Sequence, residues 1–77
     1  MIKVTIGTST QRLPEKIVEK TMTIKEVLEE AEVVYEAAQI HIDGAIASPT
    51  DMNASFETLG ITDSCRIIAV VKTNNGI

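Results

Sequence analysis

The apolar residues of this chain recur with two different spacings, and this contrast limits the folds that the chain can adopt. Over residues 2–7 apolar and polar residues alternate, which is typical of a strand with one buried face. Over residues 24–31 the apolar residues are spaced by three and four, which predicts an amphipathic helix. The run 67–71 is apolar throughout, as in a central strand that is buried on both faces. The pattern therefore predicts an α+β domain with one helix packed on a sheet.

The helix has a well-defined start. Thr23-Ile24-Lys25-Glu26 matches a capping box, in which a hydroxyl and a carboxylate accept hydrogen bonds from unpaired N–H groups of the first turn. The predicted apolar face consists of Ile24, Val27, Leu28 and Ala31. Because the β-branched pair Val33-Val34 and then Tyr35 follow, we expect a helix of about three turns that frays at this point.

Turn residues divide much of the remaining sequence into short strands. Residues 7–14 predict a turn, and the charged segment 15–21 suits an edge strand that pairs back on the first strand. Asp43-Gly44 is a strong signal for a tight hairpin. This hairpin is expected to join short strands at 40–42 and 45–47.

The C-terminal part is expected to supply the centre of the sheet. Residues 50–60 are irregular in pattern, but a short turn of helix can insert three apolar side chains into the core, namely Phe56, Leu59 and Ile61. The last strand is predicted over residues 66–72. Since the first and last strands are the most apolar, we expect them to pair in parallel at the middle of a mixed sheet.

Length and composition are consistent with one small domain. The chain has 77 residues, 44% of them hydrophobic, which suffices for a single core. We expect the domain to span residues 1–73, with a polar tail at 74–77.

The single cysteine, Cys65, allows no internal disulfide and fits a reducing compartment. No apolar run approaches the ~20 residues that cross a bilayer, so a cytoplasmic protein with no membrane partner is expected.

The charge balance argues against nucleic acid as a partner. Seven basic and eleven acidic residues give a net charge of −4, and the basic residues are scattered singly. Nucleic-acid binders usually cluster their cations, and many stack bases on aromatic rings. This chain has only Tyr35 and Phe56 as aromatic residues. We therefore expect no nucleic-acid partner.

The order of these signals resembles the ubiquitin-like β-grasp superfamily over nearly the whole chain. The resemblance lies in Met1-Ile2-Lys3-Val4, Thr23-Ile24-Lys25-Glu26-Val27-Leu28, Ile42-Asp43-Gly44, and Phe56-Glu57-Thr58-Leu59-Gly60-Ile61. It implies a mixed four- to five-stranded sheet, with one helix on one face and the last strand between the first and third. The phrases His41-Ile42-Asp43-Gly44 and Gly60-Ile61-Thr62-Asp63-Ser64-Cys65 look most like small prokaryotic ubiquitin-like proteins of bacteria and mobile elements. That narrower resemblance implies a fold and little chemistry, and our hypothesis is a non-enzymatic adaptor or accessory protein.

Strand alternation separates an inner and an outer face of this sheet. The inward residues are predicted to be Ile2, Val4, Ile6, Ile40, Ile42, Ile67, Ala69 and Val71. The outward residues are then Lys3, Thr5, His41, Arg66, Ile68, Val70 and Lys72. Ile68 and Val70 would form an apolar centre with a basic rim, which is a candidate docking surface for a protein partner or a second copy of the chain. A register shift of one residue would exchange the two faces.

The C-terminus raises a second hypothesis. The resemblance implies that a modifier or sulfur carrier would act through a flexible tail ending in Gly-Gly, whose carboxylate is activated. This chain ends in Asn74-Asn75-Gly76-Ile77, so such chemistry needs removal of Ile77 and conjugation through Gly76. A frayed polar terminus also accounts for these residue types.

An enzyme is the third hypothesis. A Cys–His nucleophile pair would need His41 and Cys65 within hydrogen-bond reach. Alternation instead places Cys65 inward, where a free cysteine behaves as a small hydrophobe, and His41 outward. The acidic residues match no calcium loop and no His/Cys cluster. We therefore predict no catalytic residue, no metal and no cofactor.

Overall fold

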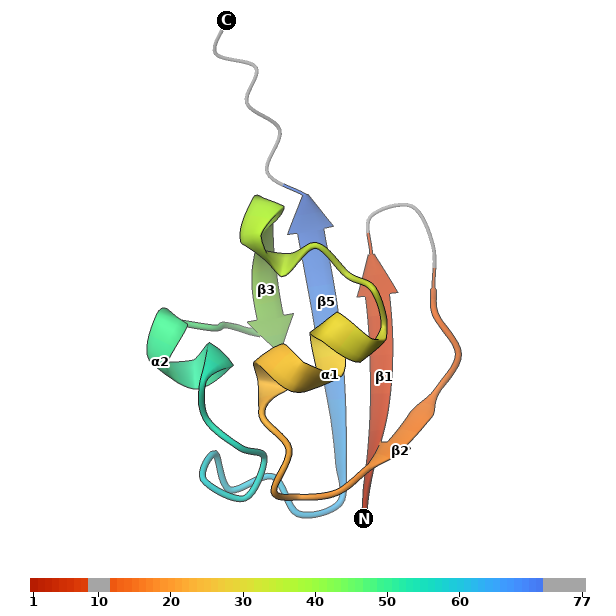
Figure 1. Ribbon diagram of the computed structural model, residues 1–77, viewed down its shortest axis with the longest axis vertical. Coiled ribbons are helices and arrows are strands. Elements are labelled where there is room, and N and C mark those ends of the chain that lie inside the picture. Colours follow the sequence, from red (N-terminus) through yellow and green to blue (C-terminus); the bar gives the residue numbers. More distant parts are fainter. Residues whose placement is uncertain (9–11, 72–77) are drawn as a thin grey trace, which may run out of the picture.

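Five strands form one sheet in the order β2-β1-β5-β3-β4 (Figure 1). The computed structural model describes residues 1–8 and 12–71 of the chain. The strands are β1 Ile2–Thr8, β2 Lys16–Val18, β3 Ala38–Ile42, β4 Ala45–Ile46 and β5 Ser64–Val71. β1 and β5 pair in parallel, and the other neighbours are antiparallel. This arrangement confirms the predicted mixed sheet and places β5 between β1 and β3.

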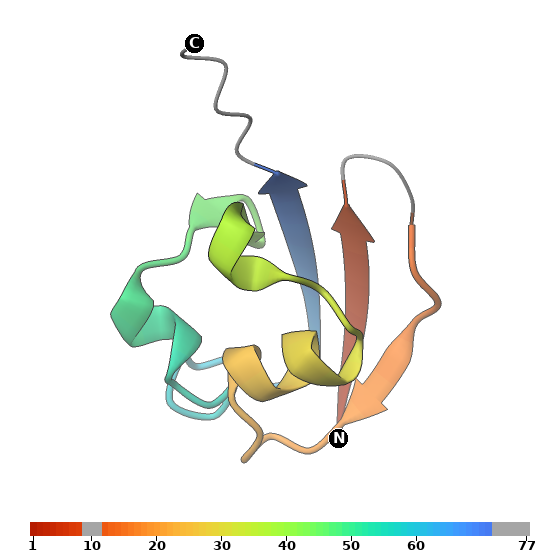
Figure 2. The ribbon, with the colours of Figure 1, turned by 45° about the horizontal axis from the view of Figure 1, so that its top comes forward.

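The helix α1, Ile24–Glu30, lies across one face of the sheet over β1 and β5 (Figures 1 and 2). The predicted capping box is present: Glu26 N donates to Thr23 Oγ1 at 3.1 Å, and Thr23 N donates to Glu26 Oε1 at 2.9 Å. The residues that α1 buries are Ile24, Val27 and Leu28. The local sequence signal and the packing therefore agree at the start of this helix.

The end of α1 differs from the prediction. The helix has seven residues, which is about two turns rather than three. Glu32 takes a left-handed conformation with φ 60°, and its N–H donates to Glu29 O at 3.0 Å. Val33 N donates to Leu28 O at 2.9 Å, which completes a Schellman motif. The expected fraying is thus replaced by a defined helix end, because Val33 packs against the core.

The core lies between α1 and the inner face of the sheet. Its buried residues are Ile2, Val4, Ile6, Val18, Ile24, Val27, Leu28, Ala38, Ile40, Phe56, Cys65, Ile67 and Ala69. The predicted inward assignment is confirmed for β1, and for β5 at Ile67 and Ala69; Ile42 is partly buried against the same core. The assignment of Val71 concerns a side chain outside the described set.

The connection between β4 and β5 is more ordered than the sequence suggested. Residues Pro49–Met52 form α2, which has its own capping box from Ser48 and Asp51. Phe56 is fully buried, as the sequence predicted. Leu59 and Ile61 are partly buried and pack against the core. Phe56 therefore supplies the one aromatic ring of the buried core described here.

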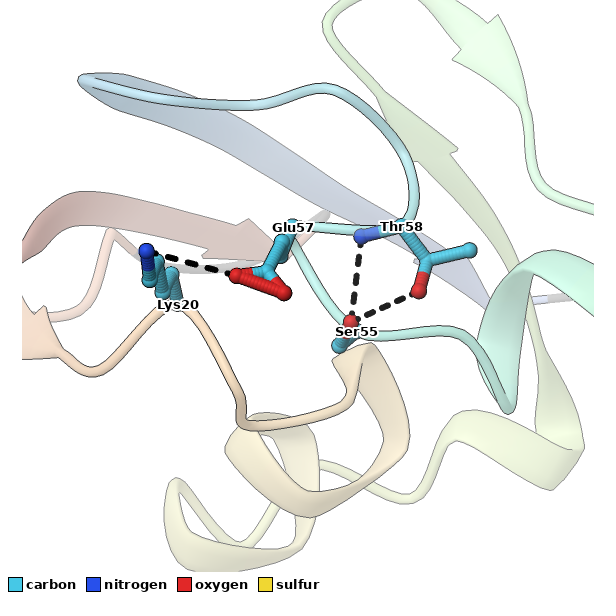
Figure 3. Close-up of polar contacts among 4 residues, drawn as sticks. All are labelled: Lys20, Ser55, Glu57 and Thr58. Atoms are coloured by element: carbon cyan, nitrogen blue, oxygen red, sulfur yellow. Dashed lines mark hydrogen bonds and ion pairs between the residues drawn. The ribbon is translucent and has the colours of Figure 1, made fainter.

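Backbone and side-chain contacts hold this segment against the turn between β2 and α1. Phe56 N donates to Met22 O at 3.2 Å, and Glu57 N donates to Lys20 O at 3.0 Å. Figure 3 shows Ser55 Oγ accepting from Thr58 N at 3.1 Å and donating to Thr58 Oγ1 at 2.9 Å. The Lys20 Nζ and Glu57 Oε2 atoms lie 3.3 Å apart in the same view. These contacts fix Phe56 beneath the sheet.

Several predicted boundaries were displaced. The edge strand β2 covers three residues rather than 15–21, and β4 covers two rather than 45–47. The strand β3 begins at Ala38, directly after an unpredicted 3-10 helix, η1, at Tyr35–Ala37. Predicted positions in 72–77 lie outside the described residues. Within the described part of the chain, no helix is both long enough and apolar enough to span a membrane.

Candidate protein-binding surface

The face of the sheet opposite α1, here called the open face, brings together six of the seven residues predicted to point outward. The sheet register pairs Thr5 with Arg66 and His41 with Ile68. Paired residues in a sheet project to the same side, so these side chains are neighbours. Lys3 and Val70 project from the same face, on β1 and β5. The seventh residue, Lys72, lies outside the described residues.

The apolar centre of the open face is formed by Ile68 and Val70. Val70 is 41% exposed and Ile68 is partly buried. Gly7 pairs with Ile68 across β1 and β5, and a Cβ atom built on Gly7 would lie 3.3 Å from Ile68 Cδ1. The missing side chain therefore lets Ile68 rest on β1. This close approach explains why Ile68 is less exposed than Val70.

Two exposed isoleucines extend this surface and were not predicted. Ile46 pairs with His41 and is 61% exposed, while Ile17 pairs with Lys3 and is 56% exposed. The sequence could have predicted that Ile46 lies on this face, because a two-residue Asp-Gly turn sets the hairpin register. The sequence could not have predicted the position of Ile17, because the adjacent apolar residues at 17 and 18 do not alternate and so do not show which of them faces the core.

Basic side chains surround the apolar centre. Lys3 and Arg66 are exposed and line a concavity of about 670 Å³, whose rim includes Glu15 and Asp43. The carboxylate of Asp43 is engaged, because its Oδ1 accepts from Arg66 N at 2.9 Å. Among the described residues the ion pairs are Lys16–Glu30 and Lys20–Glu57, so neither Lys3 nor Arg66 is in one. Their charges remain available to an incoming molecule.

The helix side of the molecule has the opposite charge. Glu26, Glu29 and Glu30 of α1 are all exposed. Tyr35 Oη donates to Glu29 Oε2 at 3.0 Å. Desolvation, this hydrogen bond and the nearby carboxylates raise the pKa of Tyr35, because each disfavours the phenolate. The net negative charge of the chain is therefore concentrated away from the centre of the open face.

His41 and Cys65 do not form a catalytic pair. Cys65 is buried in the core opposite Val4, whereas His41 projects from the open face beside Ile68. Burial, with a smaller contribution from Asp43, raises the pKa of Cys65 to about 12. The thiolate is the nucleophilic form, so a thiol with this pKa is unreactive at neutral pH. Within residues 1–8 and 12–71, no group of three His, Cys, Asp or Glu residues is placed to hold a metal ion.

Comparison with solved structures identifies the fold. The Arabidopsis thaliana protein At2g32350 superposes with a TM-score of 0.70 at 20% identity, over 96% of this chain and 89% of that one. A ubiquitin from Caldiarchaeum subterraneum superposes with a TM-score of 0.67 at 17% identity, over 97% and 98% of the two chains. This chain has the ubiquitin-like β-grasp fold.

A second ubiquitin-like protein of the same archaeon matches with a TM-score of 0.54 at 17% identity, over 96% of this chain and 97% of that one. No protein-family model and no curated protein sequence matches the chain. These three neighbours come from a plant and an archaeon, so they show the ubiquitin-like fold and not the narrower resemblance to proteins of bacteria and mobile elements.

Proposed function

We propose that this ubiquitin-like module is a non-enzymatic adaptor that binds a protein partner through the open face. The observation that supports the proposal most directly is the position of Ile68 and Val70. They form an apolar centre on a sheet face that α1 does not cover, and unpaired cations lie beside it. Clustered apolar side chains with a polar rim are characteristic of docking surfaces.

Burial of this surface would contribute favourably to binding. Removing apolar area from water stabilises a complex by about 25 cal/mol per Å². Val70, Ile46 and Ile17 each retain more than two fifths of their exposed area in the free domain, at 41%, 61% and 56%. A partner that covers them therefore gains from the hydrophobic effect, while Lys3 and Arg66 select its charge.

The proposal is tested with the same substitution at two exposed valines. Val70→Asp places a charge in the apolar centre, whereas Val34→Asp makes the same change at a 67% exposed residue away from it. Partners captured from lysate of the native host by the wild-type chain are identified by mass spectrometry. The dissociation constant of the purified partner is then measured by calorimetry. We expect at least a tenfold loss for Val70→Asp, which is about 1.4 kcal/mol, and no change for Val34→Asp.

Ile68→Asp provides a second variant on the same surface. We expect it to abolish binding while the domain remains folded, because Ile68 projects away from the core. Equal binding by wild type, Val70→Asp and Ile68→Asp would reject the open face as the docking site. Unfolding of Ile68→Asp alone would leave Val70→Asp to decide the question.

The modifier or carrier alternative depends on Gly76 and Ile77, which lie outside the described residues. The ubiquitin-like fold is compatible with it. Intact-mass measurement of the protein from its native host distinguishes the two functions, because processing removes Ile77 and conjugation adds mass at Gly76. The carrier would be favoured if protein from the native host shows such a mass change and Val70→Asp binds the partner as tightly as wild type.

The cytoplasmic, mobile-element accessory role is a further part of the proposal, based on the sequence resemblance. Phage or conjugation genes beside the coding gene would support it. A neighbouring gene for an activating enzyme or for a tail-trimming protease would instead favour the carrier.

A further inference from the structure

We infer that the partner presents a carboxylate beside an aliphatic side chain, and that Arg12 and Arg66 receive the carboxylate while Ile68 and Val70 receive the aliphatic group. This inference rests on the proposed binding role of the open face. It adds a residue, Arg12, that the sequence pattern did not associate with that face, and it specifies the chemistry of the partner.

Backbone pairing with β1 places Arg12 at the open face. Arg12 forms an isolated antiparallel bridge with Gly7, and the next residue is anchored by Leu13 N, which donates to Ile6 O at 2.9 Å. Arg12 and Leu13 thus lie alongside β1. The result is that Arg12 and Arg66, distant in sequence, line one concavity of about 140 Å³ together with Ile68.

The two guanidinium groups are not neutralised by the protein. The ion pairs among the described residues involve Lys16 and Lys20, not Arg12 or Arg66. Guanidinium groups favour planar, two-oxygen acceptors such as carboxylates. Two of them around one small concavity form a subsite for an anion, and no carboxylate is among the described residues that line this concavity.

The floor of the concavity explains why the anion should be attached to an aliphatic neighbour. Thr5, Gly7 and Ile68 line it with the two arginines. Gly7 shows no positive φ, so its conformation does not require glycine. What glycine provides is space, since a Cβ atom at this position would press on Ile68 Cδ1 at 3.3 Å. The carboxylate subsite and the Ile68 side chain are therefore in direct contact.

An acidic protein segment fits these features better than nucleic acid or a second copy. The cations beside the subsite are few, and among the described residues of the open face there is no Phe, Tyr or Trp and His41 is the one ring on which a base could stack. A symmetric dimer through this face would bring Lys3, Arg12 and Arg66 of both copies into one interface with Glu15 and Asp43 as the carboxylates lining the same face, so cations would be in excess there. A segment with a carboxylate near an apolar side chain can contact both the two arginines and the apolar centre formed by Ile68 and Val70.

The test is an NMR titration of the intact ¹⁵N-labelled chain with two synthetic helical peptides. Both contain leucine and alanine, with glutamate in one peptide and glutamine in the other placed four positions from leucine, so that the two side chains share a face. Amide signals of Gly7 and Ile68 and the guanidinium Nε–H signals of Arg12 and Arg66 report binding. We expect the glutamate peptide to bind about threefold to tenfold more tightly, with the difference reduced at high salt.

Charge-removing variants locate the subsite. Arg12→Gln and Arg66→Gln should each abolish the preference for the glutamate peptide over the glutamine peptide. Lys25→Gln, at an exposed cation on α1, is the matched control and should leave the preference intact. Amide spectra of the free variants verify that each is folded.

Four outcomes would overturn the inference: equal affinity for the two peptides, no binding of either, an unaltered preference in Arg12→Gln, or equivalent shifts caused by inorganic phosphate alone. The proposed function fails separately. If the natural partner is sensitive to Val70→Asp but not to Arg12→Gln, the open face binds the partner and only the carboxylate subsite is wrong. If Val70→Asp has no effect on that partner, the proposed function itself is wrong.

Discussion

Gly7 and Glu32 show how single residues set the local structure of this domain. Gly7 leaves room for Ile68 to lie against β1, which shapes the open face. Glu32 shows the opposite case, a residue with a side chain in a left-handed conformation that glycine adopts without strain. The first residue matches its environment, and the second pays a conformational cost to terminate α1. Both effects are measurable by substitution.

Glu32→Gly should stabilise the domain by about 0.5–1 kcal/mol, because it removes the steric cost of φ 60° at the helix end. Urea denaturation measures the change. Glu30→Gly, inside α1, is the control and should destabilise the domain by a similar amount, because glycine is unfavourable in a helix. A destabilised Glu32→Gly variant would contradict the role assigned to the helix end.

Cys65 should make stability depend on alkaline pH. Its folded pKa of about 12 exceeds the unfolded value of about 8.5, so its contribution is complete below the unfolded pKa and is lost as the pH rises toward 12. The stability of wild type relative to Cys65→Ala should fall by about 1.4 kcal/mol per pH unit between roughly pH 9 and pH 11. Denaturation at several pH values measures it. A difference that is constant over this interval would show that the thiol titrates normally.

At the scale of elements, β5 determines both the core and the open face. Cys65, Ile67 and Ala69 are buried, whereas Arg66 and Val70 are exposed. The run 67–71 is apolar throughout, so hydropathy alone does not separate its faces, but the predicted alternation with Ile67 and Ala69 inward agrees with their burial. Its parallel pairing with β1 and antiparallel pairing with β3 put it at the centre of the sheet.

The two faces of β5 predict unequal effects at adjacent residues. Ile67→Ala should cost about 2–5 kcal/mol, because it leaves a cavity beside fully buried neighbours. Ile68→Ala should cost only about 1 kcal/mol, since Ile68 is partly exposed and borders solvent. Chemical denaturation of the two variants provides the comparison. A larger loss for Ile68→Ala than for Ile67→Ala would mean that the register of β5 is displaced by one residue.

At the scale of the whole molecule, charge is divided between two sides. The exposed carboxylates of α1 lie on one side, and Lys3, Arg12 and Arg66 lie on or beside the open face. A net charge of −4 therefore conceals a face on which the cations Lys3, Arg12 and Arg66 outnumber the neighbouring carboxylates Glu15 and Asp43. This division favours a partner with acidic groups and opposes symmetric self-association through the open face.

The chain should accordingly be monomeric at low ionic strength. Two open faces would bring like charges together, and repulsion extends to about 30 Å at 0.01 M salt. Sedimentation velocity over a range of protein concentrations measures the oligomeric state. Added salt should permit weak dimerisation if it has any effect, because it screens the repulsion. A dimer that is strongest at low salt would instead support the homodimer that the apolar patch also suggested.

The local signals in the sequence determined much of the fold. The capping box at Thr23 placed the start of α1, Asp43-Gly44 placed the hairpin, and alternation along β1 assigned its two faces. Each depends on chemistry within a few residues, which is why it can be read without the structure. Together with the resemblance to ubiquitin-like proteins, they led to the correct fold class and to six residues that share the open face.

Only the tertiary structure decided the remaining features, because each depends on contacts between distant segments. α1 ends early because Val33 packs against the core, and Ile17 joins the open face because of its pairing with Lys3. Arg12 and Arg66 line one concavity because Arg12 bridges to Gly7 on β1. No spacing in the sequence encodes these contacts, since they are set by how the strands and the core pack together.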